Sequence, residues 1–159
     1  MWPVCGHSSA GWVYPQSVQV VEVTEQATVA ALRPLLADLA WTGDEAHVDR
    51  VMRPYVEDPD ARLFAALTTG PIGVLGIRQA GDDAEVLAIV VAVPERRQGV
   101  GRALIEETQK LTDSRTMWAE TDRDAVGFYQ ACGFRVMSLG EQHPGVERFR
   151  CTRLWGSTP

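Results

Sequence analysis

The sequence predicts an α/β fold with one mixed, mainly antiparallel sheet of six or seven strands flanked by about four helices. Segments of β-branched residues and segments of helical apolar spacing alternate along the 159-residue chain, in the order strand, two helices, three strands, helix, strand, helix and two strands. The three consecutive strands are joined by short glycine-containing turns, which favours antiparallel pairing. The last of the three is apolar throughout and leads directly into a helix, as in the buried strands of α/β sheets.

The first part of the chain is predicted to hold one strand and two helices. Ser17–Val23 is rich in β-branched residues and is expected to be the first strand. Helical apolar spacing runs from Glu25 to Trp41, and Pro34 is expected to kink or divide that helix. Asp44 stands at a good N-cap position for the second helix. The apolar residues at helical spacing in this second helix are Val48, Val51, Met52, Tyr55 and Val56.

Three strands are predicted between residues 62 and 93, with turns at Thr68–Pro71 and Ala80–Asp83. The third strand is apolar on both faces, so we expect it in the middle of the sheet, covered on both sides. The helix that follows is expected from Gly99 to Thr112. Its predicted apolar side consists of Val100, Leu104, Thr108 and Leu111.

The last part of the chain is predicted to add three strands and one short helix. Residues 116–121 are expected to be a strand, and residues 122–132 a helix stopped by Gly133. Residues 134–139 and 146–154 are expected to be two final strands.

Composition and charge limit the classes of function. The formal net charge is −6, so nucleic-acid binding has no global electrostatic support. The three cysteines, Cys5, Cys132 and Cys151, lack CxxC spacing, which argues against a disulfide framework and a zinc site and favours reduced thiols in a cytoplasmic protein. No apolar run is long enough to span a membrane. We expect one domain over residues 17–155, with a flexible arm at 1–16 and a frayed tail at 156–159.

The segment VPERRQGVG, between the apolar strand and its helix, has the features of an anion site. Free amides at a helix start, together with the helix dipole, attract anions. Gly99 and Gly101 allow close backbone approach, and Arg96 and Arg97 can clamp phosphate oxygens. The segment lacks the Lys-Ser/Thr of a Walker A loop and the third glycine of a dinucleotide fingerprint. A plain glycine turn with solvated arginines is the alternative.

Two segments resemble signatures of the GNAT superfamily of N-acetyltransferases. RRQGVG, residues 96–101, is similar to its Arg/Gln-x-x-Gly-x-Gly/Ala motif. DRDAVGFYQACGF, residues 122–134, is similar to its Asn-x-x-Ala-(x)3-Tyr-(x)3-Gly-Phe element. Asp122 stands where the family has Asn and is expected to cap the helix, and the turn between Pro94 and Arg96 is one residue shorter than usual. The resemblance covers roughly residues 17–155.

The resemblance implies that acetyl-coenzyme A binds in a splay between the fourth and fifth strands, with no metal. It implies backbone pairing of the pantetheine arm with Val91 and Val93, and further cofactor contacts from Asp122, Ala125 and Tyr129. The residues that would hold the pyrophosphate are Arg96, Arg97, Gln98, Gly99, Val100, Gly101 and Arg102. Tyr129 is also the candidate general acid, because a phenol can donate to a departing thiolate.

The general base and the acceptor are less defined by the residues. Glu85 opens the apolar strand and, by period-two alternation, would share a face with Leu87, Ile89 and Val91, so we expect it to act as base, either directly or through water. Glu120, His143 and water are the rivals. By the resemblance, the acceptor is a small-molecule amine or a protein amino group, attacking directly in a ternary complex. The aromatic residues that would face a cationic acceptor are Trp41, His47, Tyr55 and Trp118.

By analogy with the family, the final hairpin would pair two copies into a homodimer, with Trp155 as an anchor. Two other functions remain open on the sequence. The fold could bind an acyl-coenzyme A as a sensor or interaction module without turnover, or the glycine turn could bind a nucleotide phosphate in a protein unrelated to acyl transfer.

Overall fold

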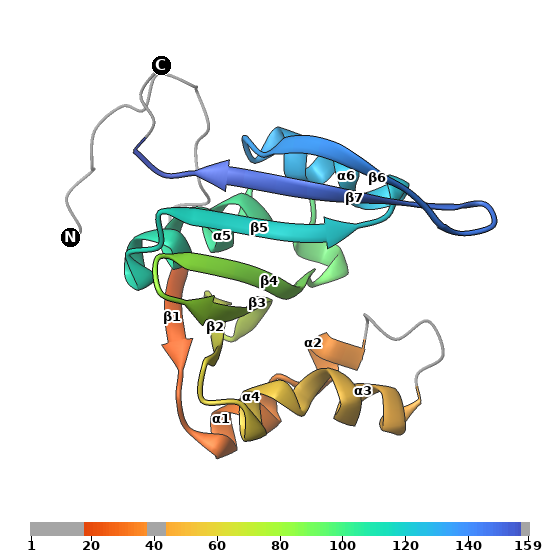
Figure 1. Ribbon diagram of the computed structural model, residues 1–159. Helices are drawn as coiled ribbons and strands as arrows, with labels where there is room; N and C mark the ends of the chain where they lie inside the picture. Colours follow the sequence, from red (N-terminus) through yellow and green to blue (C-terminus); the bar gives the residue numbers. More distant parts are fainter. Residues whose placement is uncertain (1–17, 38–43, 157–159) are drawn as a thin grey trace.

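One seven-stranded sheet organises the residues described by the computed structural model, which are 18–37 and 44–156 (Figure 1). The strands are β1 (Gln19–Val23), β2 (Ala61–Leu67), β3 (Pro71–Ala80), β4 (Asp83–Val91), β5 (Thr116–Thr121), β6 (Arg135–His143) and β7 (Val146–Leu154). Their order in the sheet is β1-β2-β3-β4-β5-β7-β6, and the pairs are antiparallel except for the parallel pair β4–β5. The predicted mixed, mainly antiparallel sheet is confirmed. The predicted arm, Trp41 and the last three residues lie outside the described residues.

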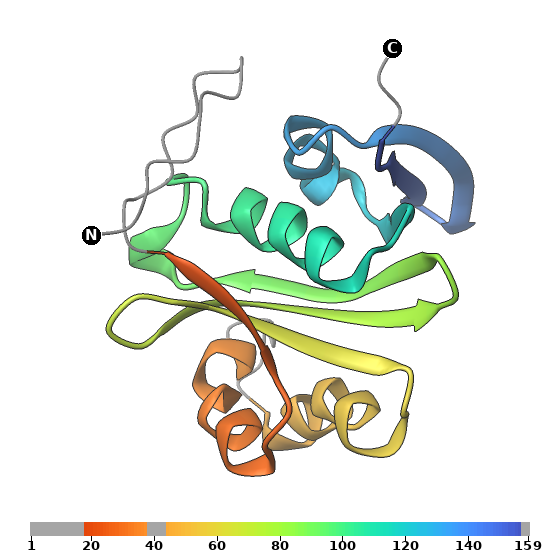
Figure 2. The same cartoon turned by 90° about the vertical axis from the view of Figure 1, so that its left-hand side faces the viewer.

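Helices cover both faces of this sheet (Figure 2). They are α1 (Gln26–Ala31), α2 (Arg33–Ala37), α3 (Glu45–Met52), α4 (Pro54–Glu57), the 3-10 turn η1 (Val93–Glu95), α5 (Val100–Thr112) and α6 (Arg123–Ala131). The first four helices build one core cluster with β1 to β4, whereas α5 and α6 build a second cluster with strands from β2 to β7. None of the described helices is both long enough and apolar enough to cross a bilayer.

The early helices begin and end where local sequence signals place them. The predicted division near Pro34 is present, because α1 ends before Leu32 and α2 restarts at Arg33. The Asp44 carboxylate caps α3 by accepting a hydrogen bond from the Ala46 amide at 3.1 Å. The predicted single second helix is divided: α3 ends at Met52 and the chain continues as the separate short helix α4, so Val56 does not share the buried side of α3 and is 60% exposed.

The helix α5 carries a buried stripe that turns around its axis. Val100, Leu104, Thr108 and Thr112 are all buried, and each step of four residues advances the stripe by about 40°. The stripe has therefore moved away from Leu111 by the last turn, so Leu111 is 52% exposed and its predicted burial is wrong.

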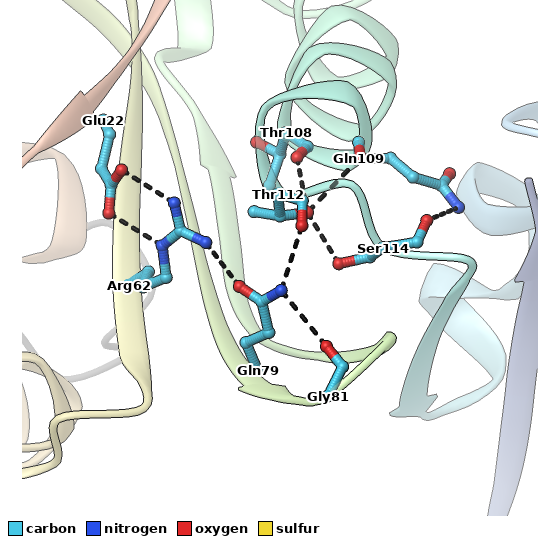
Figure 3. A network of polar contacts seen from close by, with 8 residues as sticks. All are labelled: Glu22, Arg62, Gln79, Gly81, Thr108, Gln109, Thr112 and Ser114. Carbon is cyan, nitrogen blue, oxygen red and sulfur yellow. Dashed lines mark hydrogen bonds and ion pairs between the residues drawn. The ribbon is translucent and has the colours of Figure 1, made fainter.

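A polar network fixes the C-terminal end of α5 to the β3–β4 turn (Figure 3). The Gln79 side-chain amide donates to the carbonyl oxygens of Thr112, at 3.0 Å, and of Gly81. The buried Thr112 hydroxyl donates to the Thr108 carbonyl oxygen at 2.8 Å and contacts the Ser114 hydroxyl. This anchoring positions the whole helix, whose other end faces the site described below.

The pairing of β4 with β5 is short. Asp83–Glu85 pairs with Thr116–Trp118, and no further pair joins these two strands. The C-terminal parts of both strands are therefore unpaired with each other, which confirms the predicted splay.

A β-bulge interrupts β4 at the start of this splay. Ile77 of β3 faces Val86, whereas Gly76 faces Ala88, so Leu87 is an extra residue in β4. A bulge of this kind reverses the alternation of side chains for the rest of the strand.

The bulge changes the face on which Glu85 lies. Val86, Ile89 and Val91 all belong to the cluster on the α5 side, whereas Val90 belongs to the cluster on the α1–α4 side. Glu85 precedes the bulge and points away from the α5 side. The prediction that Glu85 shares a face with Ile89 and Val91 is therefore wrong, because simple period-two alternation does not hold across Leu87.

The final hairpin is longer than predicted. The strand β6 continues to His143, and the connection contracts to a turn at Pro144 and Gly145, whose φ is 78°. The helix stop at Gly133 is confirmed, since this residue adopts a left-handed φ of 85° directly after α6.

Candidate functional site

A cleft of about 1040 Å³ opens where β4 and β5 part. Its walls come from β4, from the glycine turn and first turn of α5, from the end of β5 and from α6. The predicted site residues that line it are Val91, Arg96, Arg97, Gly99, Val100, Gly101, Arg102, Ala125 and Tyr129. The fold thus brings together the two segments on which the resemblance to acetyltransferases rests.

Four predicted site residues do not line this cleft: Glu85, Val93, Gln98 and Asp122. The prediction that Val93 ends the strand is wrong, because β4 stops at Val91 and Val93 opens the 3-10 turn η1, where it is 62% exposed. Gln98 donates from its side-chain amide to the Pro94 carbonyl oxygen at 3.0 Å and so closes the turn. Asp122 caps α6, as expected, by accepting from the amides of Asp124 and Ala125 at 3.1 and 3.3 Å.

The start of α5 presents amides that its own residues leave without a cap. Gly99 is the N-cap residue with a left-handed φ of 84°, and no side chain caps the helix. The first turn closes with the hydrogen bond from the Ala103 amide to the Gly99 carbonyl oxygen, at 2.9 Å. Arg97, a non-glycine residue, also takes a positive φ of 60° in this turn. Uncapped amides at the positive end of a helix dipole form an anion site.

Two glycines near this turn serve different purposes. A Cβ at Gly101 would lie 2.7 Å from Cε2 of Phe128, so this glycine allows α5 to pack closely on α6. A Cβ at Gly127 would meet nothing within 4 Å, and Gly127 lies inside α6 and lines the cleft. A glycine inside a helix costs about 1 kcal/mol relative to alanine. Neither packing against the described residues nor a turn explains Gly127.

The arginines of the turn are held to different degrees. Arg96 Nε donates to the Val91 carbonyl oxygen at 2.9 Å, at the end of β4. Arg102 Nε bonds the Glu106 carboxylate at 2.9 Å, and its Nη1 donates to the Ala131 carbonyl oxygen at 3.1 Å. Arg102 thereby ties α5 to the end of α6, so its predicted role in holding phosphate competes with these contacts.

Tyr129 lies at the inner end of the cleft and is 5% exposed. Its ring packs edge-on against Phe128 and Phe134, with centroid distances of 5.2 and 5.1 Å. Burial raises the pKa of the phenol above its ordinary value, with smaller contributions from Cys151 and Cys132. The phenol therefore stays protonated at neutral pH, as a proton donor requires.

Cys132 lines the cleft, although no motif in the sequence predicted it as a site residue. It follows Tyr129 by three residues, so it lies on the same side of the helix end. Burial raises the pKa of this thiol to about 11, although Arg102 and Arg153 oppose the rise. A thiol with this pKa is a poor nucleophile at neutral pH.

The candidate bases lie in three different places. Glu85 is in the paired part of β4, opposite Trp118, and its carboxylate contacts Arg78 Nη1 at 3.2 Å. Glu120, near the end of β5, lines the cleft. His143 is at the tip of the β6–β7 hairpin and lies outside the cleft.

A second hollow of about 620 Å³ adjoins the first and shares Glu120 with it. Its lining residues are Glu120, Leu139, Gln142, His143, Val146, Arg148 and Arg150. Neither arginine was predicted as a site residue, because only the pairing of β7 with β5 brings Arg150 opposite Glu120.

Of the predicted aromatic wall for a cationic acceptor, the three described residues, His47, Tyr55 and Trp118, are not brought together around the cleft. The Arg150 guanidinium lies over the Trp118 ring, 4.3 Å from its centroid, and so already occupies that face. Tyr55 packs on the backbone of β3, where a Cβ at Gly76 would lie 1.7 Å from its hydroxyl oxygen. His47 is half-buried on α3. Within residues 18–37 and 44–156, no group of three or more His, Cys, Asp or Glu side chains is placed to hold a metal ion.

Comparisons with known proteins agree with this architecture. Residues 59–136 match the acetyltransferase (GNAT) domain family. A protein assigned to the GNAT family of acetyltransferases, from Desulfovibrio desulfuricans, is 16% identical, with a TM-score of 0.71 over 87% of this chain and 99% of that one. An aminoglycoside 6'-N-acetyltransferase complexed with coenzyme A is 17% identical, with a TM-score of 0.69 over 89% and 99%. Spermidine/spermine N-acetyltransferase SpeG from Vibrio cholerae is 17% identical, with a TM-score of 0.64 over 87% and 93%. No curated protein matches the chain.

Proposed function

We propose that this chain, a member of the GNAT superfamily of acetyltransferases, is an N-acetyltransferase that uses acetyl-coenzyme A. The observation that carries the proposal is the cleft between β4 and β5, which ends on the uncapped first turn of α5. The acceptor is a primary amine of a small molecule or a protein. The similar structures named for spermidine and aminoglycoside acetyltransferases support an amine as the acceptor.

The residues of the cleft fit acetyl-coenzyme A. The amides of Gly99, Val100 and Gly101 and the guanidinium groups of Arg96 and Arg97 would hold its pyrophosphate. The free space beside Gly127 supports close approach of a ligand to α6. When bound, acetyl-coenzyme A supplies an acetyl group as a thioester.

The backbone of β4 would bind the pantetheine arm through Val91. Arg96 now donates to the Val91 carbonyl oxygen, so it would exchange this partner for a phosphate oxygen when the cleft fills. Arg102 would contribute only through the charge it keeps near the turn, because its contacts hold it to Glu106 and Ala131. Three of the predicted contacts are not proposed to touch the cofactor: Val93 and Gln98 shape the turn before α5, and Asp122 caps the start of α6. Ala125 lines the cleft and is proposed as a direct contact.

Tyr129 is the proposed general acid. Its hydroxyl holds a proton throughout the neutral range and donates it to the departing sulfur. Direct transfer in a ternary complex is favoured over a covalent acyl-enzyme, because the pKa of about 11 keeps the cleft-lining Cys132 thiol protonated. The proposed proton acceptors for the amine are Glu120, Glu85 and His143. Glu120 is the first choice by position, since it lies at the junction of the cleft and the hollow, whereas Glu85 would act through water.

Titration calorimetry with acetyl-coenzyme A, followed by a thiol-release assay over a panel of amines, tests the proposal. We expect saturable binding and release of one thiol per acetylated amine. Binding without thiol release for any amine would favour the second candidate, an acyl-coenzyme A sensor, which the engagement of Glu85 by Arg78 also supports. Absence of binding at millimolar ligand would contradict both functions.

The assembly and location of the protein are part of the proposal. We expect a cytoplasmic homodimer in which the β6–β7 hairpin contributes contacts. Trp155, 42% exposed beyond the end of β7, and the exposed side chains of Met137 and Val146 support a contact there. Sedimentation velocity tests the homodimer: a single monomeric species at micromolar concentration would contradict it.

A further inference from the structure

The second hollow lies on the face of the sheet opposite α5 and α6. Met117, Ala119 and Cys151 of β5 and β7 belong to the core cluster on the α5 side. The alternating neighbours Glu120 and Arg150 therefore point to the opposite face. In Figure 1, α5 and α6 lie behind β5 and β7, and none of the described helices lies in front of these strands. Among the described helices none covers the hollow, which shares Glu120 with the cleft.

The hollow has an excess of positive charge. Two guanidinium groups, of Arg148 and Arg150, face one carboxylate, that of Glu120, among the side chains that line it. Arg150 pairs with this carboxylate, with Nε donating at 3.2 Å. Arg148 Nη2 instead donates to the main-chain carbonyl oxygen of Glu120 at 3.2 Å. Within the described residues no carboxylate forms an ion pair with Arg148.

The neighbouring charges leave this excess in place. Glu147, the residue before Arg148, turns to the other face and binds Arg123 and the Ser138 hydroxyl. The aromatic face of Trp118, which would otherwise attract a cationic ligand, is covered by Arg150. The local charge of the hollow is therefore opposite in sign to the net charge of −6 of the whole chain.

We propose that the acceptor is a small amine that also carries a carboxylate, an amino acid, and that Arg148 selects it by binding this carboxylate. This inference rests on the proposed function. A guanidinium can bind a carboxylate through two parallel hydrogen bonds, and Arg148 has no carboxylate partner of its own among the described residues. The amino group of the same molecule then lies beside Glu120, at the junction with the cleft. A polyamine or an aminoglycoside would instead meet the two guanidinium groups.

The test compares three series of acceptors in the thiol-release assay: the standard amino acids, their carboxamides, and the amines that lack the carboxyl group, with spermidine as the polycation. We expect kcat/KM to be greatest for an amino acid and to fall by about 10- to 100-fold for its carboxamide and its amine, since hydrogen bonds to charged groups account for factors of this size.

Variants of Arg148 separate selection from a structural role. Arg148→Gln should raise KM for the preferred amino acid by about 10-fold or more and leave kcat nearly unchanged, because the contact is made equally before and during the reaction. Arg148→Lys should recover part of this loss. Arg115→Gln is the matched control: it removes an arginine that is paired with Asp82 before the start of β5. All variants should bind acetyl-coenzyme A as the parent does.

The outcomes distinguish the two proposals. If acetyl-coenzyme A binds and spermidine or the carboxyl-free amines are preferred, or if Arg148→Gln leaves the preference for amino acids intact, the inference about the acceptor is overturned and the acetyltransferase proposal stands. If the parent protein does not bind acetyl-coenzyme A, the proposed function falls and this inference falls with it.

Discussion

Replacing Tyr129 by phenylalanine removes one oxygen atom from the inner end of the cleft. No hydrogen bond of this hydroxyl to the described residues is present, and the ring is held by Phe128 and Phe134. The packing should therefore survive, and the free energy of unfolding should change by less than about 1 kcal/mol. A general acid contributes about 10²- to 10⁴-fold to the rate, which corresponds to about 3 to 5 kcal/mol of activation free energy. Turnover should fall far more than stability.

The assay is steady-state thiol release at saturating acetyl-coenzyme A, with calorimetry to measure cofactor affinity and thermal unfolding to measure stability. Tyr55→Phe is the matched control, because Tyr55 is a second, partly buried tyrosine with a raised pKa that packs on β3, outside the cleft. We expect kcat of Tyr129→Phe to fall at least 100-fold, with cofactor affinity within about threefold of the parent, and Tyr55→Phe to keep its turnover. A kcat for Tyr129→Phe within about threefold of the parent would refute its role as the acid.

The raised pKa of Tyr129 adds a pH dependence with a definite sign. In the folded state burial favours the neutral phenol, so its pKa is higher than in the unfolded chain. The stability that this difference contributes is fully present below the unfolded pKa of about 10 and is lost as pH rises above it. Tyr129→Phe should therefore lose less stability than the parent between about pH 10 and 12, measured by chemical denaturation.

Three further predictions concern the glycines of α5 and α6, the cap of α6 and the thiol of Cys132. Gly127→Ala should raise the free energy of unfolding by about 0.5 to 1 kcal/mol and weaken acetyl-coenzyme A binding. Gly101→Ala should lower the free energy of unfolding by about 1 to 3 kcal/mol, because its Cβ would clash with Phe128. Denaturant unfolding measures the stability of both variants and calorimetry their cofactor binding, and unchanged binding by Gly127→Ala would argue against a ligand at α6. Asp122→Ala should lower the free energy of unfolding by about 0.5 to 2 kcal/mol, because the α6 cap is lost. Its affinity for acetyl-coenzyme A should stay unchanged, and a large loss of affinity would show that Asp122 touches the cofactor. Iodoacetamide should alkylate Cys132 at pH 8 about 100-fold more slowly than a free thiol, because the pKa of Cys132 is about 11. Mass spectrometry measures the rate, and labelling at the free-thiol rate would contradict the burial of this side chain.

Local signals in the sequence were sufficient to predict most elements. The glycine turn, the N-cap at Asp122 and the stop at Gly133 depend on residues close to one another in the chain, so the bounds of β5, α5 and α6 agree closely with the predictions. The splay was expected from the resemblance to the GNAT superfamily, and the two motifs that carry this resemblance lie in continuous segments of the sequence.

The features that were missed depend on contacts between distant residues. The bulge at Leu87 exists only in the pairing of β4 with β3, so the face of Glu85 could not be read from alternation. The Arg150 guanidinium lies over the Trp118 ring only because β7 pairs with β5. The expectation of a cationic acceptor rested on aromatic residues in the sequence, which do not report the local charge at Arg148.

The proposed binding of acetyl-coenzyme A depends most directly on the anion site at the start of α5. Titration of the uniformly ¹⁵N-labelled protein with coenzyme A, followed by backbone amide NMR, examines that site residue by residue. We expect the amide resonances of Gly99, Val100 and Gly101 to shift on addition of coenzyme A and to saturate at the same ligand concentration. Pantetheine, which lacks the pyrophosphate, should leave these resonances nearly unchanged. Amides at these three positions that stay unchanged at millimolar coenzyme A would contradict the proposed binding.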